Sequence, residues 1–448
     1  MASRSLLARR FARCSTVLAL VVHCGSALAA PKLQGIGEAA LGYTDNVQTA
    51  PQTSLPGDTT RTSAALLMLS PGVLLAWQSA RVIQRIGYQY EHDFFFAEAA
   101  SNSSANRLEY QGFFDLSPRV ALVLGAGITE SNRYASLNML PPGVAEVSAL
   151  PVGAQTFLQG NADETLYFDV ARNWRAWQGG NVLYETPIFK TQAPQTSGVG
   201  ARTGLERLFR RDAVGSEARA NYTVVRDAIG VDGLPRETQQ QLVFTAVGTW
   251  RHDWSTLFAS SAEAGALRVQ RFNTGRGAWY PTGTASLFYT QRVGDAQLSY
   301  THTVTTNALL GQSLLVDEIR LRGGVPLTRR GDVVLASNLA FQYGRLIDEN
   351  AELAARVNVL QGDVLLGWQA TEILQLGVRY QHIEQISDAT TAPLPLSFVQ
   401  NSALVGATIK LPPDRDMPRA YRAARRVDGQ DEIRDAAQPD SQLEPIGD

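Results

Sequence analysis

Long stretches of this chain alternate between apolar and polar residues, which is the pattern of a β-strand whose two faces meet different surroundings. From 107 to 116 the even positions read Leu, Tyr, Gly, Phe, Leu, and among the odd positions only Phe113 is apolar. The same period of two recurs at 82–90, 120–128, 242–250, 298–304, 333–343, 374–380 and 403–409. The pattern predicts β-strands along nearly the whole chain.

A soluble β-sandwich also produces such alternation, but three features favour a barrel in a membrane. The predicted strands are about ten to fourteen residues long, whereas strands of soluble proteins average five or six. The polar faces carry fixed charges of both signs in succession, and the connections alternate between short and long. A barrel with lipid outside and water inside has all three features. Since lipid offers no hydrogen-bond partner to the backbone, a β-patterned chain spans a membrane only by closing on itself.

The connections give the strand number. About eight short turns and about nine longer loops join about eighteen strands, and both chain ends fall on the short-turn side. We therefore expect an all-β fold, a transmembrane antiparallel up-and-down barrel of about 18 strands over 30–411. Sixteen strands is the alternative, because the segment near 200–210 is weakly patterned. In a Gram-negative outer membrane the short turns and both termini of such a barrel face the periplasm.

The first residues indicate export. Four arginines precede the apolar run Val17–Val22, and a small-residue motif, Ala27–Ala29, follows. This order is typical of a secretory signal peptide, expected over 1–29. A lipoprotein signal at Cys24 is the weaker alternative, since the preceding His23 is not small. Both cysteines, Cys14 and Cys24, lie in this segment, so the exported chain is expected to contain no disulfide.

Charge and motifs exclude several functions. The formal net charge of −2 gives no electrostatic reason to bind nucleic acid. The sequence contains no Gly-x-Ser-x-Gly, His-Glu-x-x-His, P-loop, Cys-x-x-Cys or calcium-loop motif. We expect neither an enzyme, a metal site nor a cofactor.

Three of the five histidines stand in a repeated Tyr-x-His triplet. Each triplet has the parity of the lipid-facing residues and ends a strand that leads into a long loop. Rings of this kind favour the headgroup layer, so an aromatic girdle is expected rather than a metal or catalytic site. The predicted girdle residues at the long-loop end are Tyr90, His92, Tyr300, His302, Tyr380 and His382. Those at the short-turn end are Trp174, Trp250, Trp254 and Trp368.

The opposite parity predicts the wall of a water-filled lumen. Its mixed charges and amides suit a hydrated channel or the passage of polar polymers, although pairing across strands would use the same residues only to stiffen the wall. The loop at 132–155 is the candidate constriction. The predicted lumen residues are Arg81, Arg85, Gln89, Glu91, Arg107, Glu109, Gln111, Asp115, Glu217, Arg219, Asn221, Gln297, Thr301, Glu318, Arg320, Arg322, Gln375, Arg379 and Gln381.

The tail at 412–448 has a different composition. Arginines between 415 and 426 precede an acidic run that ends at Asp448, with no aromatic residue beyond Tyr421. We expect a disordered charged segment in the periplasm, either passive or able to dock a partner.

The opening of the barrel resembles a known family. The segments Leu41–Val47 and Leu69–Val73, followed by the Tyr88-x-Tyr90 strand, are similar to the start of the outer-membrane family called β-barrel porin 2, which is associated with exopolysaccharide systems. The short motifs cover about the first 95 residues. The resemblance implies a barrel of sixteen to eighteen strands that moves a polysaccharide beside a periplasmic export protein. The family would end its last strand on an aromatic residue, whereas this one ends near Leu411.

Two functions follow as hypotheses. The first is a channel component that exports a polysaccharide, such as an exopolysaccharide, capsule or coat, with lipid, the glycan chain and an export protein as partners. The alternative is a general diffusion porin for small polar solutes.

Overall fold

The computed structural model describes residues 31–47, 62–79, 81–96, 102–132, 156–188, 195–226, 238–273, 275–291, 294–307, 312–347, 356–387 and 397–413. Within these ranges the chain contains no helix that is long and apolar enough to cross a membrane. The predicted signal peptide, the loop at 132–155 except its first residue and the tail beyond Pro413 lie outside the described residues.

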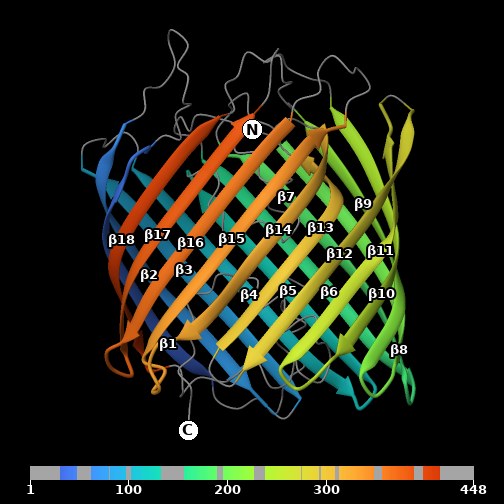
Figure 1. Cartoon of the computed structure of the whole chain (residues 1–448), viewed down its shortest axis with the longest axis horizontal. Helices are drawn as coiled ribbons and strands as arrows, with labels where there is room; N and C mark the ends of the chain where they lie inside the picture. The colour runs from blue at the N-terminus through green and yellow to red at the C-terminus, as the bar shows by residue number, and fades with distance from the viewer. Residues whose placement is uncertain are drawn as a thin grey trace, which may run out of the picture.

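The described residues form eighteen antiparallel strands in one sheet. Each strand pairs with the next along the chain, and β1 pairs with both β2 and β18, so the sheet closes into a barrel (Figure 1). The predicted all-β barrel of eighteen strands is therefore confirmed, including the weakly patterned strand near 200–210, which is β8. The strands are β1 (Lys32–Thr44), β2 (Ala64–Gln78), β3 (Val82–Phe95), β4 (Ser103–Ser117), β5 (Val120–Ser131), β6 (Phe157–Ala171), β7 (Trp174–Pro187), β8 (Gln195–Leu208), β9 (Asp212–Arg226), β10 (Gln239–Asp253), β11 (Phe258–Arg271), β12 (Gly277–Gln291), β13 (Gly294–Asn307), β14 (Gln312–Pro326), β15 (Val333–Leu346), β16 (Arg356–Gln369), β17 (Leu374–Ser387) and β18 (Phe398–Leu411).

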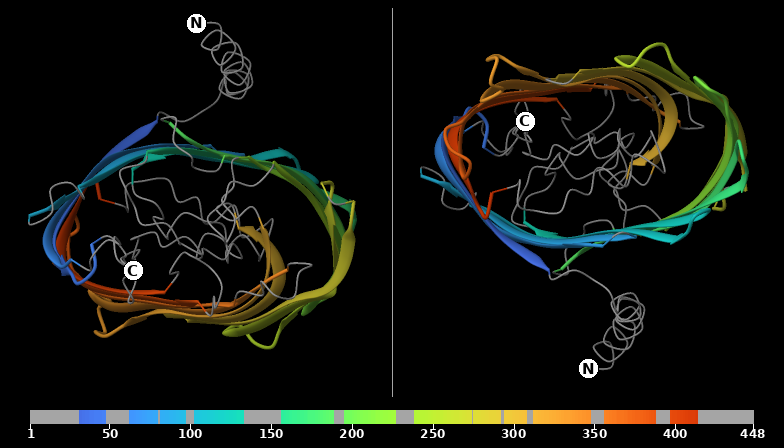
Figure 2. Two further views of the ribbon diagram at one scale, coloured as in Figure 1. Left: turned by 90° about the horizontal axis from the view of Figure 1, so that it is seen from above. Right: turned by 90° about the horizontal axis from the view of Figure 1, so that it is seen from below.

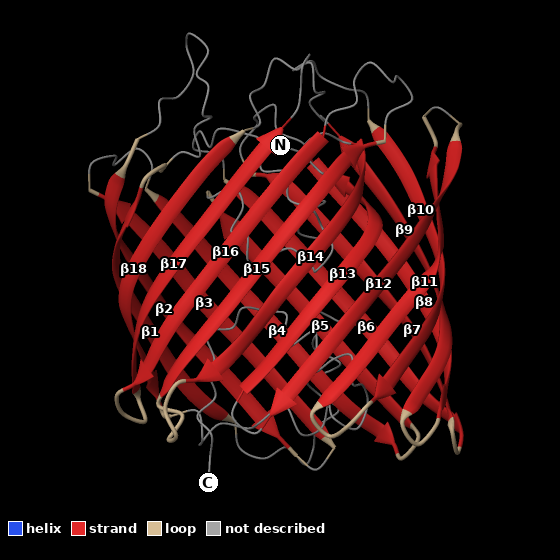
Figure 3. Ribbon diagram, viewed as in Figure 1, coloured by secondary structure: helices blue, strands red, loops and turns tan. Residues whose placement is uncertain are grey.

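Short and long connections alternate, and they define two rims (Figure 3). We call them the short-turn rim and the long-loop rim. Hydroxyl side chains stabilise several short turns by accepting backbone N–H groups, as Ser and Thr commonly do in turns. The Oγ of Ser79 accepts from Val82 N at 3.1 Å, and the Oγ of Ser255 accepts from Phe258 N at 3.1 Å.

The two faces of the wall differ as the alternation requires. Large apolar side chains such as Ile319 (51% exposed) and Val405 (61% exposed) point away from the ring and have no protein over them. Their neighbours in sequence, such as Glu318 and Arg320, have the opposite parity and face inward. Seen along its axis, the ring is elongated, with the blue-to-teal strands on one long side and the orange-to-red strands on the other (Figure 2). A closed barrel with an apolar outside and a polar inside is the architecture of an outer-membrane β-barrel.

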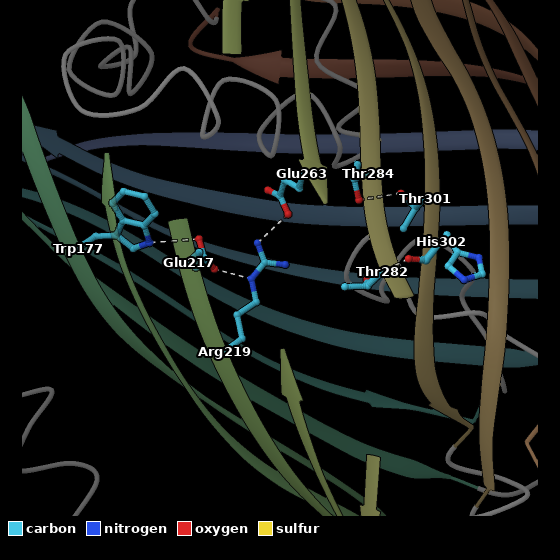
Figure 4. Close-up of polar contacts among 8 residues, drawn as sticks. All are labelled: Trp177, Glu217, Arg219, Glu263, Thr282, Thr284, Thr301 and His302. Carbon is cyan, nitrogen blue, oxygen red and sulfur yellow. Dashed lines mark hydrogen bonds and ion pairs between the residues drawn. The ribbon is translucent and has the colours of Figure 1, made fainter. Parts of the chain in front are cut away.

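Besides small register shifts between β4 and β5 and between β6 and β7, the described strands separate at one place, between β12 and β13. Their ladder ends at the pair Gly283 and His302, although β12 continues to pair with β11 as far as Gly277, and β13 with β14 as far as Asn307. Thr282 Oγ1 donates to the carbonyl of His302 at 3.0 Å at the point where the strands separate (Figure 4). Next to it lies Pro281, which has no N–H to give to a ladder, so this edge tolerates one-sided pairing.

Beyond this fork, the long-loop ends of β13, β14 and β15 bend into the lumen, where the gold ribbon leaves the wall (Figure 2). We call these ends the inward arm. The Ser313 hydroxyl bonds to the side chain of Gln241 on β10, four strands away around the ring. Val304 of the arm packs against the buried Leu267 and Val269 of β11. The arm therefore lies across the inside of β11 and β12.

The two faces predict opposite tolerance for a new charge. Val364 on β16 faces outward near the middle of the strand, and the inward Gln361 lies three residues away. We expect Val364→Arg to lower the free energy of unfolding by about 2–4 kcal/mol, because the cation would enter hydrocarbon. Urea titration in lipid vesicles measures this value. Gln361→Arg is the matched control and should unfold like the wild type, whereas equal effects of both variants would contradict the assignment of faces.

Candidate functional site in the barrel lumen

The registers place every residue of the predicted lumen set that lies in a strand on the inward face, opposite to the exposed apolar residues. Arg81 lies in the turn just before β3. Charged and amide side chains therefore line much of the lumen, and the lumen is the candidate site.

One network joins β9 to β7 on one side and to β11 on the other (Figure 4). Arg219 bonds to Glu217 on its own strand, and its second nitrogen donates to Glu263 Oε2 at 3.0 Å. Trp177 Nε1 donates to Glu217 Oε2 at 3.2 Å. One cation thus lies between two carboxylates, which leaves the group with a net charge of about −1 at neutral pH.

A second network covers the wall formed by β13 to β17. Glu318 forms an ion pair with Arg320 at 3.0 Å and accepts from Gln342 Nε2 at 2.5 Å. Three further hydrogen bonds on this wall join an arginine or glutamine donor to a side-chain oxygen of a neighbouring strand. Arg322 Nε donates to Gln297 Oε1 at 2.8 Å, and Asp363 Oδ2 accepts from Arg379 Nε at 2.6 Å and from Gln381 Nε2 at 3.0 Å. Both signs of charge alternate on this wall, so it offers no long run of one sign.

Sequence reasoning missed Trp177 and two carboxylates of these networks, Glu263 and Asp363. Each carboxylate faces inward and meets an arginine that was predicted, Arg219 and Arg379 respectively. Parity alone would have placed both carboxylates inside. Their partners depend on the register between strands, which the sequence does not state.

The inner wall also has an apolar region, of which the sequence gave one sign, the apolar Phe113 at a polar position of its strand. Phe113, the residue that breaks the alternation of β4, faces inward and packs with Ile83, Ala121 and Tyr167 in a buried cluster, against which Trp177 is packed. Phe113 therefore faces inward as the geometry of its strand requires, and its cluster makes the inner wall apolar at this place near the short-turn rim.

The Tyr-x-His triplets lie on the outward face toward the long-loop rim. In two of them the neighbouring strand places a polar residue opposite the histidine, and that residue bonds to both rings. Asp317 Oδ1 accepts from Tyr300 at 2.6 Å and lies 2.7 Å from His302 Nδ1. Asn401 Oδ1 makes the corresponding contacts with Tyr380 and His382, both at 2.8 Å. The third triplet differs, since Tyr90 bonds to its own His92 at 3.2 Å.

The tryptophans expected at the other end lie near the short-turn rim. Trp174, Trp250 and Trp368 face outward, and Trp254 lies in the turn between β10 and β11. Asp212 bonds to both Trp250 Nε1 and His252 Nδ1, as Asp317 bonds to both Tyr300 and His302. These positions agree with a girdle of rings with polar tips, and the girdle role itself stays a prediction.

Within the described residues, no group of three or more His, Cys, Asp or Glu side chains could hold a metal ion. What the inward residues offer instead is a ring of hydrogen-bond donors and acceptors around a lumen. Donors and acceptors of this kind can bond to water and to polar groups.

No family model matches the chain, and no curated protein matches it. Solved structures do match. Pseudomonas aeruginosa OccK2 (OpdF) in complex with glucuronate is 11% identical, with 85% of this chain and 98% of that chain covered and a TM-score of 0.44. A BenF-like porin from Pseudomonas fluorescens is 8% identical, with coverages of 86% and 99% and a TM-score of 0.45. Acinetobacter baumannii OccAB3 is 11% identical, with coverages of 85% and 99% and a TM-score of 0.43.

Identities of this size say nothing about what this chain transports. The expected association with exopolysaccharide systems finds no support among these matches, which include a porin by name.

The Arg219 network predicts a change of ion selectivity. Arg219→Ala would leave Glu217 and Glu263 without their cation, so the lumen should prefer cations more strongly. Glu263→Gln removes one negative charge from the same network and should shift selectivity toward anions. The reversal potential of single channels across a KCl gradient measures both. Shifts in the same direction for the two variants would contradict a role of this network in setting the lumen potential.

The shared acceptor predicts a loss of stability. Asp317→Ala would leave the Tyr300 hydroxyl and the His302 ring without their partner, and we expect the free energy of unfolding to fall by about 1 kcal/mol for each lost bond. Asp317→Asn keeps the acceptor oxygen and is the control. If both variants unfold at the urea concentration of the wild type, the bonds of Asp317 to Tyr300 and His302 contribute nothing to stability.

Proposed function

We propose that this barrel is a channel for small polar solutes in the outer membrane of a Gram-negative bacterium. Its short-turn rim and both chain ends would face the periplasm, and its long loops the outside. The observation that carries the proposal is the complete ring of eighteen strands with an apolar outside and charged, hydrogen-bonding side chains inside. A barrel of this size leaves room within the ring for an aqueous path.

The charge pattern supports a path of low selectivity. Arg219, Arg320 and Arg379 each pair with a carboxylate of the wall. Paired charges of both signs hold ordered water and give a weak net potential, which admits small solutes of either sign.

Polysaccharide export was the first hypothesis, and no observation within the described residues favours it over small solutes. The features that pointed to it from the sequence were the tail and the family resemblance. The tail lies outside the described residues, and the resemblance finds no support. The small-solute channel is therefore the better-supported function.

Reconstitution of the purified full-length chain in a planar bilayer tests the proposal. We expect stepwise currents in KCl and a cation-to-anion permeability ratio within a few-fold of one, because inward charges of both signs are interleaved. Swelling of vesicles that contain the protein should be faster with small sugars than with long oligosaccharides. Absence of any conductance, or loss of a surface polysaccharide on gene deletion with general permeability unchanged, would overturn the proposal.

A further inference from the structure

Four polar side chains on the inner wall between β5 and β9 have no partner among the described residues. They are Asn161, Asp163, Asn181 and Asn221, which we call the amide patch. All four face the lumen and are exposed. Within the part of the chain that the structure describes, no hydrogen bond or ion pair uses any of them. This separates them from Arg219, Arg320 and Arg379, each of which pairs with a carboxylate.

The registers bring the patch together in two adjacent rows across the sheet. One row runs from Gly125 through Asp163, Asn181 and Gly200 to Asn221 on five consecutive strands. Asn161 stands in the next row, beside Gly127 and one step closer to the long-loop rim. With strands about 4.8 Å apart and rows about 6.8 Å apart, the patch measures about 14 Å by 7 Å. These dimensions suit a solute of one or two sugar rings.

Glycines give the patch its flat shape. A Cβ atom at position 200 would overlap the Oδ1 atoms of both Asn181 and Asn221, and one at position 125 would overlap the carboxylate of Asp163. The side chains therefore lean over the places where neighbouring residues lack a side chain. Their polar ends lie along the wall instead of projecting into the lumen, so a solute can meet several of them at once.

The chemistry of the patch selects a class of ligand. Three amides supply donors and acceptors together, and one carboxylate supplies acceptors alone. A hydroxyl group both donates and accepts, so a polyhydroxylated solute matches this set. An anionic solute would meet the Asp163 carboxylate without a free cation of the patch to compensate. Arg202 stands in the adjoining row, and its guanidinium donates to Thr165 instead of to a residue of the patch.

From this geometry we infer that the amide patch is a binding subsite for neutral saccharides within the lumen. The inference rests on the proposed channel function and adds its substrate class. A saccharide in contact with Asp163, Asn181 and Asn221 lies against the β6–β9 wall and exchanges its hydroxyl bonds with the patch as it moves.

Current block in a planar bilayer tests this with maltose and glucuronate as probes. We expect maltose to reduce the KCl current of the full-length chain in a saturable way, and glucuronate to need a concentration at least about fivefold higher. Asn181→Ala and Asn221→Ala should each raise the half-blocking maltose concentration about fivefold, the equivalent of one lost hydrogen bond. Asp163→Asn should narrow the difference between maltose and glucuronate.

Two further variants separate binding from folding. Gly200→Ala adds one methyl group that displaces both asparagines, so it should weaken maltose block while the conductance in sugar-free KCl stays near the wild-type value. Leu298→Ala changes an outward residue of β13, away from the lumen, and block by maltose should be unchanged.

The outcomes distinguish the two levels of the proposal. A chain without conductance refutes the channel itself. A conducting chain that maltose does not block, or that these patch variants leave equally sensitive, refutes the subsite alone. Block by calcium chloride in place of maltose, lost in Asp163→Asn, would make the patch a cation site and would also overturn the inference.

Discussion

The need to pair every backbone N–H and C=O group away from water governs this structure. In hydrocarbon an unpaired group costs several kcal/mol, so no strand in the wall can be left with a long free edge. The chain meets the requirement by pairing β1 with β18, whose partners are more than 350 residues apart in sequence, as in the contact of Asn401 with Asp45. Closure then fixes which side of every strand meets lipid, and the alternation of residues follows from it.

Most of the architecture could be predicted, because period-two alternation and the lengths of connections are local properties. Leu108, Tyr110 and Phe114 mark the outside of β4 without any knowledge of its neighbours. The separation of β12 from β13 at Gly283 and His302 could not be predicted. It depends on contacts of the inward arm, such as Ser313 with Gln241, between strands that are not adjacent.

The candidate site divides in the same way. Parity assigned Arg219 and Arg379 to the lumen, but their carboxylate partners depend on the register between strands. The bonds of Asp317 and Asn401 to the Tyr-x-His rings depend on register as well. Predicting the amide patch would require the register of three strands at once. The patch requires that Asn181 and Asn221 flank the same glycine, which only the pairing of β7, β8 and β9 establishes. Within the described part of the lumen, then, Arg219 and Arg379 pair with carboxylates, whereas Asn181 and Asn221 bond to no described residue.

The join between β1 and β18 also bears on how the molecule is made. All other neighbouring strands are consecutive in the chain, and each pair can form its hydrogen bonds starting from the turn or loop that joins it. The last pairing brings the two ends of the ring together at a high cost in chain entropy, and contacts of such long range slow folding. Until these contacts form, β1 and β18 are edge strands with unpaired backbone groups that can pair with other chains. We therefore expect the pairing of β1 with β18, where Asp45 bonds to Asn401, to form last in folding.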